Sequence, residues 1–299
     1  MFETPETMEE TSEQEWKDET DRKNVLASLE RVGCCEVLHE DVIDRMIRIE
    51  KGSRFNEYSR KIKQGIGNVF NLLKERYSEQ YPELRHSDEQ RLEVLRAAIL
   101  HDIGKSGPAE ATPQEQEMII KIFAHENIRD TKLLVTEEIR ELFETGELES
   151  AQRMLEKYGI GGKTTMQQFW DKHAYWTHDI LEKYPQGLSE NTRIIAGSHH
   201  IDHDIDPYEL NEKDKTSHET RTIGILENYV DALERRVLIV LDQYEAAKER
   251  RGFSHEEALA WVKDNLAKSK NLEKNKWITD LIFAAVDELG SQGKVFQHE

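Results

Sequence analysis

The stretch AAILHDIGKSG, residues 97–107, decides how the whole chain is interpreted. An apolar run that predicts a helix ends there in a histidine, an aspartate, a glycine and a lysine. Neighbouring side chains on a helix point about 100° apart, so His101 and Asp102 can both lean toward one point from the helix end. The stretch is therefore either a polar helix end that faces water or a metal site with a phosphate-binding residue, Lys105, beside it.

The composition of the 299-residue chain, 37% hydrophobic and 34% charged, favours long helices with solvated faces. A formal net charge of −19 argues against a general nucleic-acid binder, because phosphates would meet a repulsive field. No apolar run reaches the roughly 20 residues that span a bilayer, and the acidic N-terminus lacks the pattern of a signal peptide. The adjacent Cys34 and Cys35 have poor geometry for a structural disulfide, which favours reduced thiols and a cytoplasmic location.

Helix signals dominate the chain, and no convincing strand alternation occurs, so we expect an all-α fold. We expect residues 1–22 to form an acidic disordered or linker tail and residues 23–299 to form one helical domain. Ser87 and Thr112 are expected helix N-caps, the latter with Pro113 at the first helical position. Two further short helices are expected over residues 136–146 and 150–159, each starting at its first, capping residue.

Four groups of polar residues lie in or at the end of apolar helical segments: His101 with Asp102, His173, His199 with His200, and Asp242. A single histidine at a helix end is often a cap or a surface residue, and Asp242 alone could pair with Arg236 or a histidine. An unpaired buried carboxylate is costly, however, and a metal ion would satisfy all four groups, since imidazoles and carboxylates are its usual ligands. Aspartate is the natural group to bridge two ions.

Three segments together resemble the HD superfamily of metal-dependent phosphohydrolases: HDIGK (101–105), HH (199–200) and VLIVLD (237–242). Within that superfamily the chain is most similar to the HD-GYP phosphodiesterases, which hydrolyse cyclic di-GMP. HAYWTHDIL (173–181) fits that family's H-P-x-x-G-x-x-I-L segment through its first histidine. RVLIVLDQYEAAKERRGFSHEEAL (236–259) follows the family's closing pattern, which begins with Arg236. The resemblance covers about residues 54–265.

The resemblance implies an HD-domain helical bundle with a metal centre that holds two divalent ions, iron, manganese or zinc. In it Asp102 is shared between the ions, His173, His199 and His200 serve mainly one of them, and His101 and Asp242 serve the other. The implied reaction is hydrolysis of a nucleotide-like phosphoester, with cyclic di-GMP as one candidate, by attack of a metal-bound hydroxide.

Besides Asp102, the implied catalytic residue is Lys105, which would bind a non-bridging phosphate oxygen. Arg250 and Arg251 are candidates for the same contact with the substrate. The simpler alternatives are a solvated lysine at a helix end and a basic last helical turn.

The chain departs from the HD-GYP pattern in three places. Tyr58 stands where the family has its first histidine, so one metal position is weakened, lost or completed differently. The loop HHIDHDIDPYEL (199–210) keeps Asp204 but has no glycine and no Gly-Tyr-Pro. A helical subdomain over about residues 109–163 is inserted before the His173 segment, as a lid or side wall of the site. His125 is a rival of His173 as the third ligand.

His178 belongs to the same segment as His173 in a different phase, and is expected beside the site or as a replacement for His173. The leading interpretation is a phosphohydrolase, whose partner is a small phosphorylated substrate; a homodimer is compatible with the sequence. One alternative is a catalytically silent HD-like module that binds a nucleotide or a partner protein. The other is a purely structural helical scaffold without bound metal.

Overall fold

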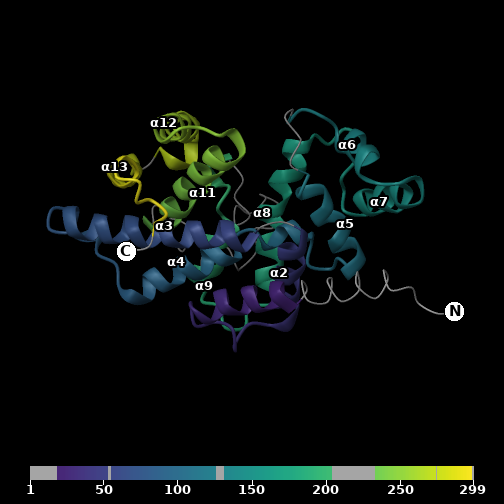
Figure 1. The fold of residues 1–299 in the computed structure, drawn as a ribbon, viewed down its shortest axis with the longest axis horizontal. Helices are drawn as coiled ribbons and strands as arrows, with labels where there is room; N and C mark the ends of the chain where they lie inside the picture. The colour runs from purple at the N-terminus through teal and green to yellow at the C-terminus, as the bar shows by residue number, and fades with distance from the viewer. Residues whose placement is uncertain (1–18, 53–54, 126–130, 204–232, 274, 298–299) are drawn as a thin grey trace, which may run out of the picture.

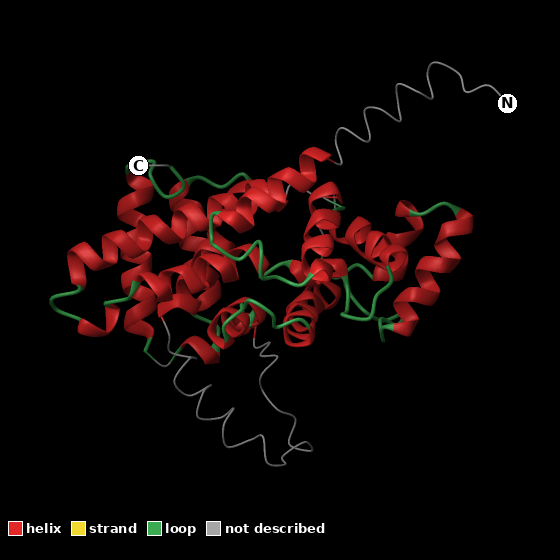
Figure 2. Ribbon diagram, turned by 90° about the horizontal axis from the view of Figure 1, so that it is seen from below, coloured by secondary structure: helices red, strands yellow, loops and turns green. Residues whose placement is uncertain are grey.

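The computed structural model describes residues 19–52, 55–125, 131–203, 233–273 and 275–297. Across these residues the secondary structure is helical, without a strand and with one isolated backbone bridge, between Leu134 and Thr165. The predicted all-α class is therefore confirmed (Figure 2). In the described part of the chain, no helix combines the length and the apolar character that crossing a membrane requires.

The larger group of helices packs around one hydrophobic core, which also includes the helical residues 19–30. Its members are α2 (Glu40–Gly52), α3 (Phe55–Tyr77), α4 (Asp88–Leu100), α9 (Glu190–Gly197), α11 (Leu233–Arg251), α12 (His255–Leu266) and α13 (Lys276–Ser291). Short 3₁₀ helices join them: η1 (Pro82–Leu84), η2 (Ile103–Ser106), η3 (Ile201–His203) and η4 (Lys270–Leu272).

A smaller group of helices has a hydrophobic core of its own. It consists of α5 (Pro113–Phe123), α6 (Val135–Leu142), α7 (Thr145–Lys157) and α8 (Met166–Lys183). Figure 1 shows α5, α6 and α7 on one side of the molecule, α11, α12 and α13 on the other, and α8 between them. Phe169 on α8 belongs to the smaller core and Ile180 to the larger one, so this helix links the two. The description of residues 109–163 as an insertion stays a prediction.

Helix starts that depend on local capping lie where the sequence predicts them. The Ser87 hydroxyl accepts from the Gln90 amide, and the Gln90 side chain accepts from the Ser87 amide. Thr112 and Glu115 form the same reciprocal pair at the start of α5, with Pro113 at the first helical position. Each pair satisfies two backbone amides that a helix start otherwise leaves unbonded.

The expected starts of the next two helices are wrong. Helix α6 begins at Val135, before the expected cap Thr136, and helix α7 begins at Thr145, so that Ser150 lies inside it. The chain changes direction at Phe143, whose backbone is extended and whose ring is buried in the smaller core. Burial of that ring sets the break between the helices, a tertiary effect that local capping signals do not contain. Residues 19–22, expected in the acidic tail, are helical.

Candidate metal centre

The HDIGK segment makes a sharp turn at the end of α4. His101 caps the C-terminal end of α4 and still has a helical backbone conformation. Asp102 leaves that helix and precedes η2, which Gly107 ends with a φ of +86°. Both side chains are thereby directed to the same side of the turn, where His101 is fully buried and Asp102 is 3% exposed. The position of these residues at a helix end is as predicted, but they face the protein interior instead of water.

The turn is held against α8 by Gly104 and Thr177. The Thr177 hydroxyl donates to the His101 carbonyl at 2.8 Å and accepts from the Gly104 amide at 3.0 Å. A Cβ atom on Gly104 would overlap the His173 carbonyl oxygen and lie 2.6 Å from the Thr177 nitrogen. Only glycine allows this approach, which brings the helix carrying His173 next to Asp102.

Arg45 holds the other end of the turn. Its guanidinium, 2% exposed, donates to the Ser106 hydroxyl at 2.9 Å and to the carbonyl oxygens of Gly107, Pro108 and Ala109 at 3.2, 3.0 and 3.1 Å. Neither Arg45 nor Thr177 is among the residues that the sequence predicts for the site. The sequence does indicate that Arg45 is buried, because it lies three residues after Val42 and four before Ile49, on the apolar face of α2.

His173 reaches the turn from α8. Its Nε2 atom lies 3.1 Å from Asp102 Oδ1 and 2.8 Å from the Nε2 atom of His199. Its Nδ1 hydrogen-bonds the carbonyl of Trp170. His125, the rival for this position, hydrogen-bonds Glu138 on α6, and the structure thus brings His173, rather than His125, to Asp102.

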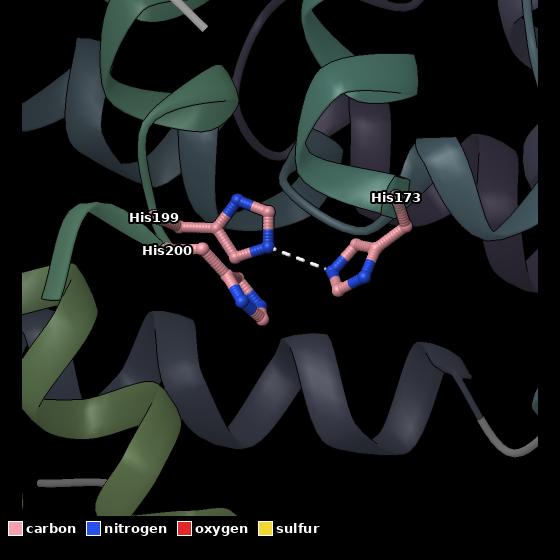
Figure 3. Close-up of side chains that lie close together, drawn as sticks. All are labelled: His173, His199 and His200. Atoms are coloured by element: carbon pink, nitrogen blue, oxygen red, sulfur yellow. Dashed lines mark hydrogen bonds between the residues drawn. The ribbon is translucent and has the colours of Figure 1, made fainter. Parts of the chain in front are cut away.

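His199 and His200 follow α9 and complete a cluster of three imidazoles with His173 (Figure 3). One ring nitrogen of each residue lies within 4.8 Å of the others, which is close enough for one metal ion to bind all three. His199 is 2% exposed, and its Nδ1 donates to the Ala196 carbonyl, 2.7 Å away. His200 is the most accessible of the three, with a side chain 15% exposed.

Asp242 approaches from α11 on the side of His101. Its Oδ1 atom lies 3.3 Å from His101 Nε2, which in turn lies 3.6 Å from Asp102 Oδ2. Burial by itself would lower the pKa of His101, but the carboxylates of Asp102 and Asp242 outweigh burial and raise it. The electrostatic field at this point therefore favours positive charge, whether a proton or a metal cation carries it.

Asp102 lies between the two histidine groups. Its Oδ1 faces His173, and its Oδ2 faces His101 and the ammonium group of Lys105, which donates to it. Burial by itself would raise the pKa of Asp102, but Lys105 and His101 outweigh burial and hold it well below its usual range. The carboxylate is thus charged, and each of its two oxygens faces a different histidine.

The two buried histidines of the cluster, His173 and His199, have a donor pattern that suits a metal. A ring nitrogen bonded to a carbonyl must carry a proton, so His173 and His199 in their neutral forms keep the Nε2 lone pairs. Burial, together with the nearby rings of His200 and His173, holds the pKa of His199 well below its usual range. Two lone pairs 2.8 Å apart repel each other, and a cation bound by both nitrogens removes that conflict. The residues present therefore fit a divalent metal ion.

The remaining predicted residues lie elsewhere or outside the described structure. His178 pairs with Asp179, 3.2 Å away. Arg251 lies over the Trp261 ring, and Arg250 is exposed at the end of α11. Arg236 is buried and donates to the Leu272 carbonyl and the Thr279 hydroxyl, so it joins α11 to the C-terminal helices. The side chain of Tyr58, on α3, and the whole of Asp204 lie outside the described residues.

Comparison of the chain with protein-family models, with curated proteins and with solved structures found no match in any of the three. The likeness to the HD superfamily therefore rests on the residues quoted above.

Proposed function

We propose that this protein is a metal-dependent phosphohydrolase that hydrolyses a nucleotide-like phosphoester. The observation that carries the proposal is the placement of Asp102, whose Oδ1 lies 3.1 Å from His173 Nε2 and whose Oδ2 lies 3.6 Å from His101 Nε2. A charged carboxylate with an imidazole group on either side is suited to bridge two cations. His199 and His200 would complete one ion site, and Asp242 the other.

Divalent ions bound at this centre would polarise a phosphoryl oxygen and lower the pKa of a bound water. The chain's own residues supply the rest. The carboxylates of Asp102 and Asp242 would offset the charge of the cations, and burial keeps His101 and His199 out of water. The Lys105 ammonium, which binds Asp102, lies near enough to exchange that carboxylate for a phosphate oxygen of the substrate.

The substrate would reach the centre from the side where its residues are accessible. The side chains of Lys105, Asp242 and His200 are 21%, 19% and 15% exposed, whereas that of His101 is fully buried. A small phosphoester suits this opening better than a nucleic acid, because the net charge of −19 repels a polyanion. Cyclic di-GMP remains the candidate that the resemblance supplies, and the two free cysteines support a cytoplasmic setting.

The test is turnover by the purified protein. Loaded with Mn²⁺ or Fe²⁺, it should hydrolyse bis(p-nitrophenyl) phosphate, and cyclic di-GMP is assayed in parallel. The His199→Ala and Asp102→Ala variants should lose activity by a factor of at least about 100, whereas His178→Ala, outside the cluster, should keep it. Full activity in the first two variants would contradict the assigned site. Bound metal and bound nucleotide without turnover would instead favour the silent HD-like module.

A further inference from the structure

The histidines of the metal centre are oriented in two different ways. In three of them Nδ1 hydrogen-bonds the carbonyl of the residue three positions earlier in the chain: His101 to Ala98, His173 to Trp170 and His199 to Ala196. This bond fixes the ring and leaves Nε2 for the metal. These three rings are also almost fully buried, so packing on every side supports the same orientation.

His200 is oriented differently. It is half-buried, and its Nδ1 lies 3.6 Å from the Oδ1 atom of Asp171, a residue of α8 two positions before His173. Its ring stands nearly perpendicular to those of His173 and His199, with interplanar angles of 88° and 89°. Although 15% of the side chain is exposed, the Nδ1 atom that faces Asp171 is buried, and a buried ring nitrogen needs a polar group beside it.

Asp171 is itself held in place. The Gln167 side chain, one helical turn earlier, donates to Asp171 Oδ1 at 2.9 Å. Both residues are on α8, whose position relative to the HDIGK turn is set by Gly104 and Thr177. The carboxylate beside His200 is therefore anchored to the same rigid helix that carries His173.

We propose that Asp171 positions His200 for metal binding. With the metal on Nε2, the His200 Nδ1 must carry a proton, and a small shortening of the present 3.6 Å separation would let the carboxylate of Asp171 accept it in a hydrogen bond. A carboxylate in this place fixes the ring orientation and makes the imidazole a stronger ligand, an effect that typically amounts to 10–100-fold in metal affinity. This inference rests on the metal centre of the proposed function but not on any substrate.

The variants that test it are Asp171→Ala and Asp171→Asn, with Asp179→Asn as the matched control. Asp179 is on the same helix and lies 3.2 Å from the Nδ1 of His178, so it forms a similar pair outside the cluster. Binding of Co²⁺ is followed by its visible absorption in competition with a chelator. We expect Asp171→Ala to weaken binding about 10–100-fold and Asp171→Asn less, because an amide oxygen still accepts the proton. Asp179→Asn should bind Co²⁺ as the unmodified protein does.

A role through His200 is separated from a structural role by a double-mutant cycle. In a His200→Ala background, Asp171→Ala should cause almost no further loss of Co²⁺ affinity, and the metal-free unfolding temperatures of the variants should agree. Equal losses in both backgrounds, or an Asp171→Ala variant with unchanged affinity, would overturn the assignment. If the unmodified protein failed to bind Co²⁺, the proposed metal centre itself would be contradicted, and the role of Asp171 with it.

Discussion

The Nε2 atoms of His173 and His199 lie 2.8 Å apart, although 26 residues separate them in the chain. Their Nδ1 atoms are bonded to carbonyls, so the two Nε2 lone pairs face each other in a buried space. Such an arrangement is stable only with a cation between the nitrogens or a proton shared by them, and the proposed metal ion would supply that cation.

Substitution of Gly104 should disrupt both stability and the metal centre. In Gly104→Ala the new methyl group would overlap the His173 carbonyl and force the HDIGK turn away from α8. We expect a loss of about 3 kcal/mol in the free energy of unfolding, measured by urea denaturation, and weaker metal binding. Gly146→Ala is the control, because a Cβ atom there meets nothing within 4 Å. Equal stability of the two variants would contradict the close approach.

Loss of Arg45 should loosen the segment that follows Lys105. Arg45→Met removes four donated hydrogen bonds and leaves buried carbonyls without their donor, for an expected loss of about 3 kcal/mol. Arg48→Met, on the same helix, removes one described bond, to Gln116, and should lose no more than about 1 kcal/mol. Thermal unfolding of the two variants gives the comparison. A larger loss in Arg48→Met would contradict the role of Arg45 in holding the turn.

Local contacts could be predicted from the sequence, whereas contacts between distant residues could not. The caps Ser87 and Thr112 were predictable because their partners lie three residues away. Arg45 and Thr177 contact residues about 60 and 75 positions away, and no local pattern specifies such pairs. The grouping of His101, Asp102, His173 and Asp242 was predicted from residue type and from the resemblance, and the structure brings them together, whereas their role in metal chemistry stays a prediction. That Asp102 faces His101 through one oxygen and His173 through the other is a tertiary fact, which the packing of α8 against the HDIGK turn provides.

The stability of the smaller core should depend on pH through Glu115. Burial by itself would raise the pKa of this carboxyl, but bonds from Lys157 and the Thr112 amide outweigh burial and lower it to about 2. A lowered carboxyl pKa stabilises the fold above the unfolded-state value of about 4.3, and that contribution is lost as the pH falls toward 2. We therefore expect Glu115→Gln to be less stable by about 1 kcal/mol at pH 7.

The difference in urea midpoint between this variant and the unmodified protein should shrink as the pH is lowered from about 5 to about 2. Comparison of the two proteins cancels the other carboxyl groups, which titrate in both. A difference that stays constant over this range would mean that Glu115 does not make these bonds.

The two cysteines should differ in reactivity. Burial raises the pKa of Cys34 to about 11, and its thiol donates to the Leu29 carbonyl, whereas Cys35 is only half-buried. Because the thiolate is the reactive form, N-ethylmaleimide should modify Cys35 in the folded protein and Cys34 only after unfolding. Peptide mass spectrometry identifies the modified residue. Equal rates at both thiols would contradict the burial of Cys34.

The most direct test of the central claim is the metal content of the freshly purified protein, measured by elemental analysis. If the imidazoles of His173, His199 and His200 form a metal centre with Asp102, the unmodified protein should carry at least one divalent ion per chain. The His178→Ala variant should carry the same amount, and His199→Ala should lose it. An unmodified protein without iron, manganese or zinc, or a His199→Ala variant with unchanged metal content, would contradict the claim.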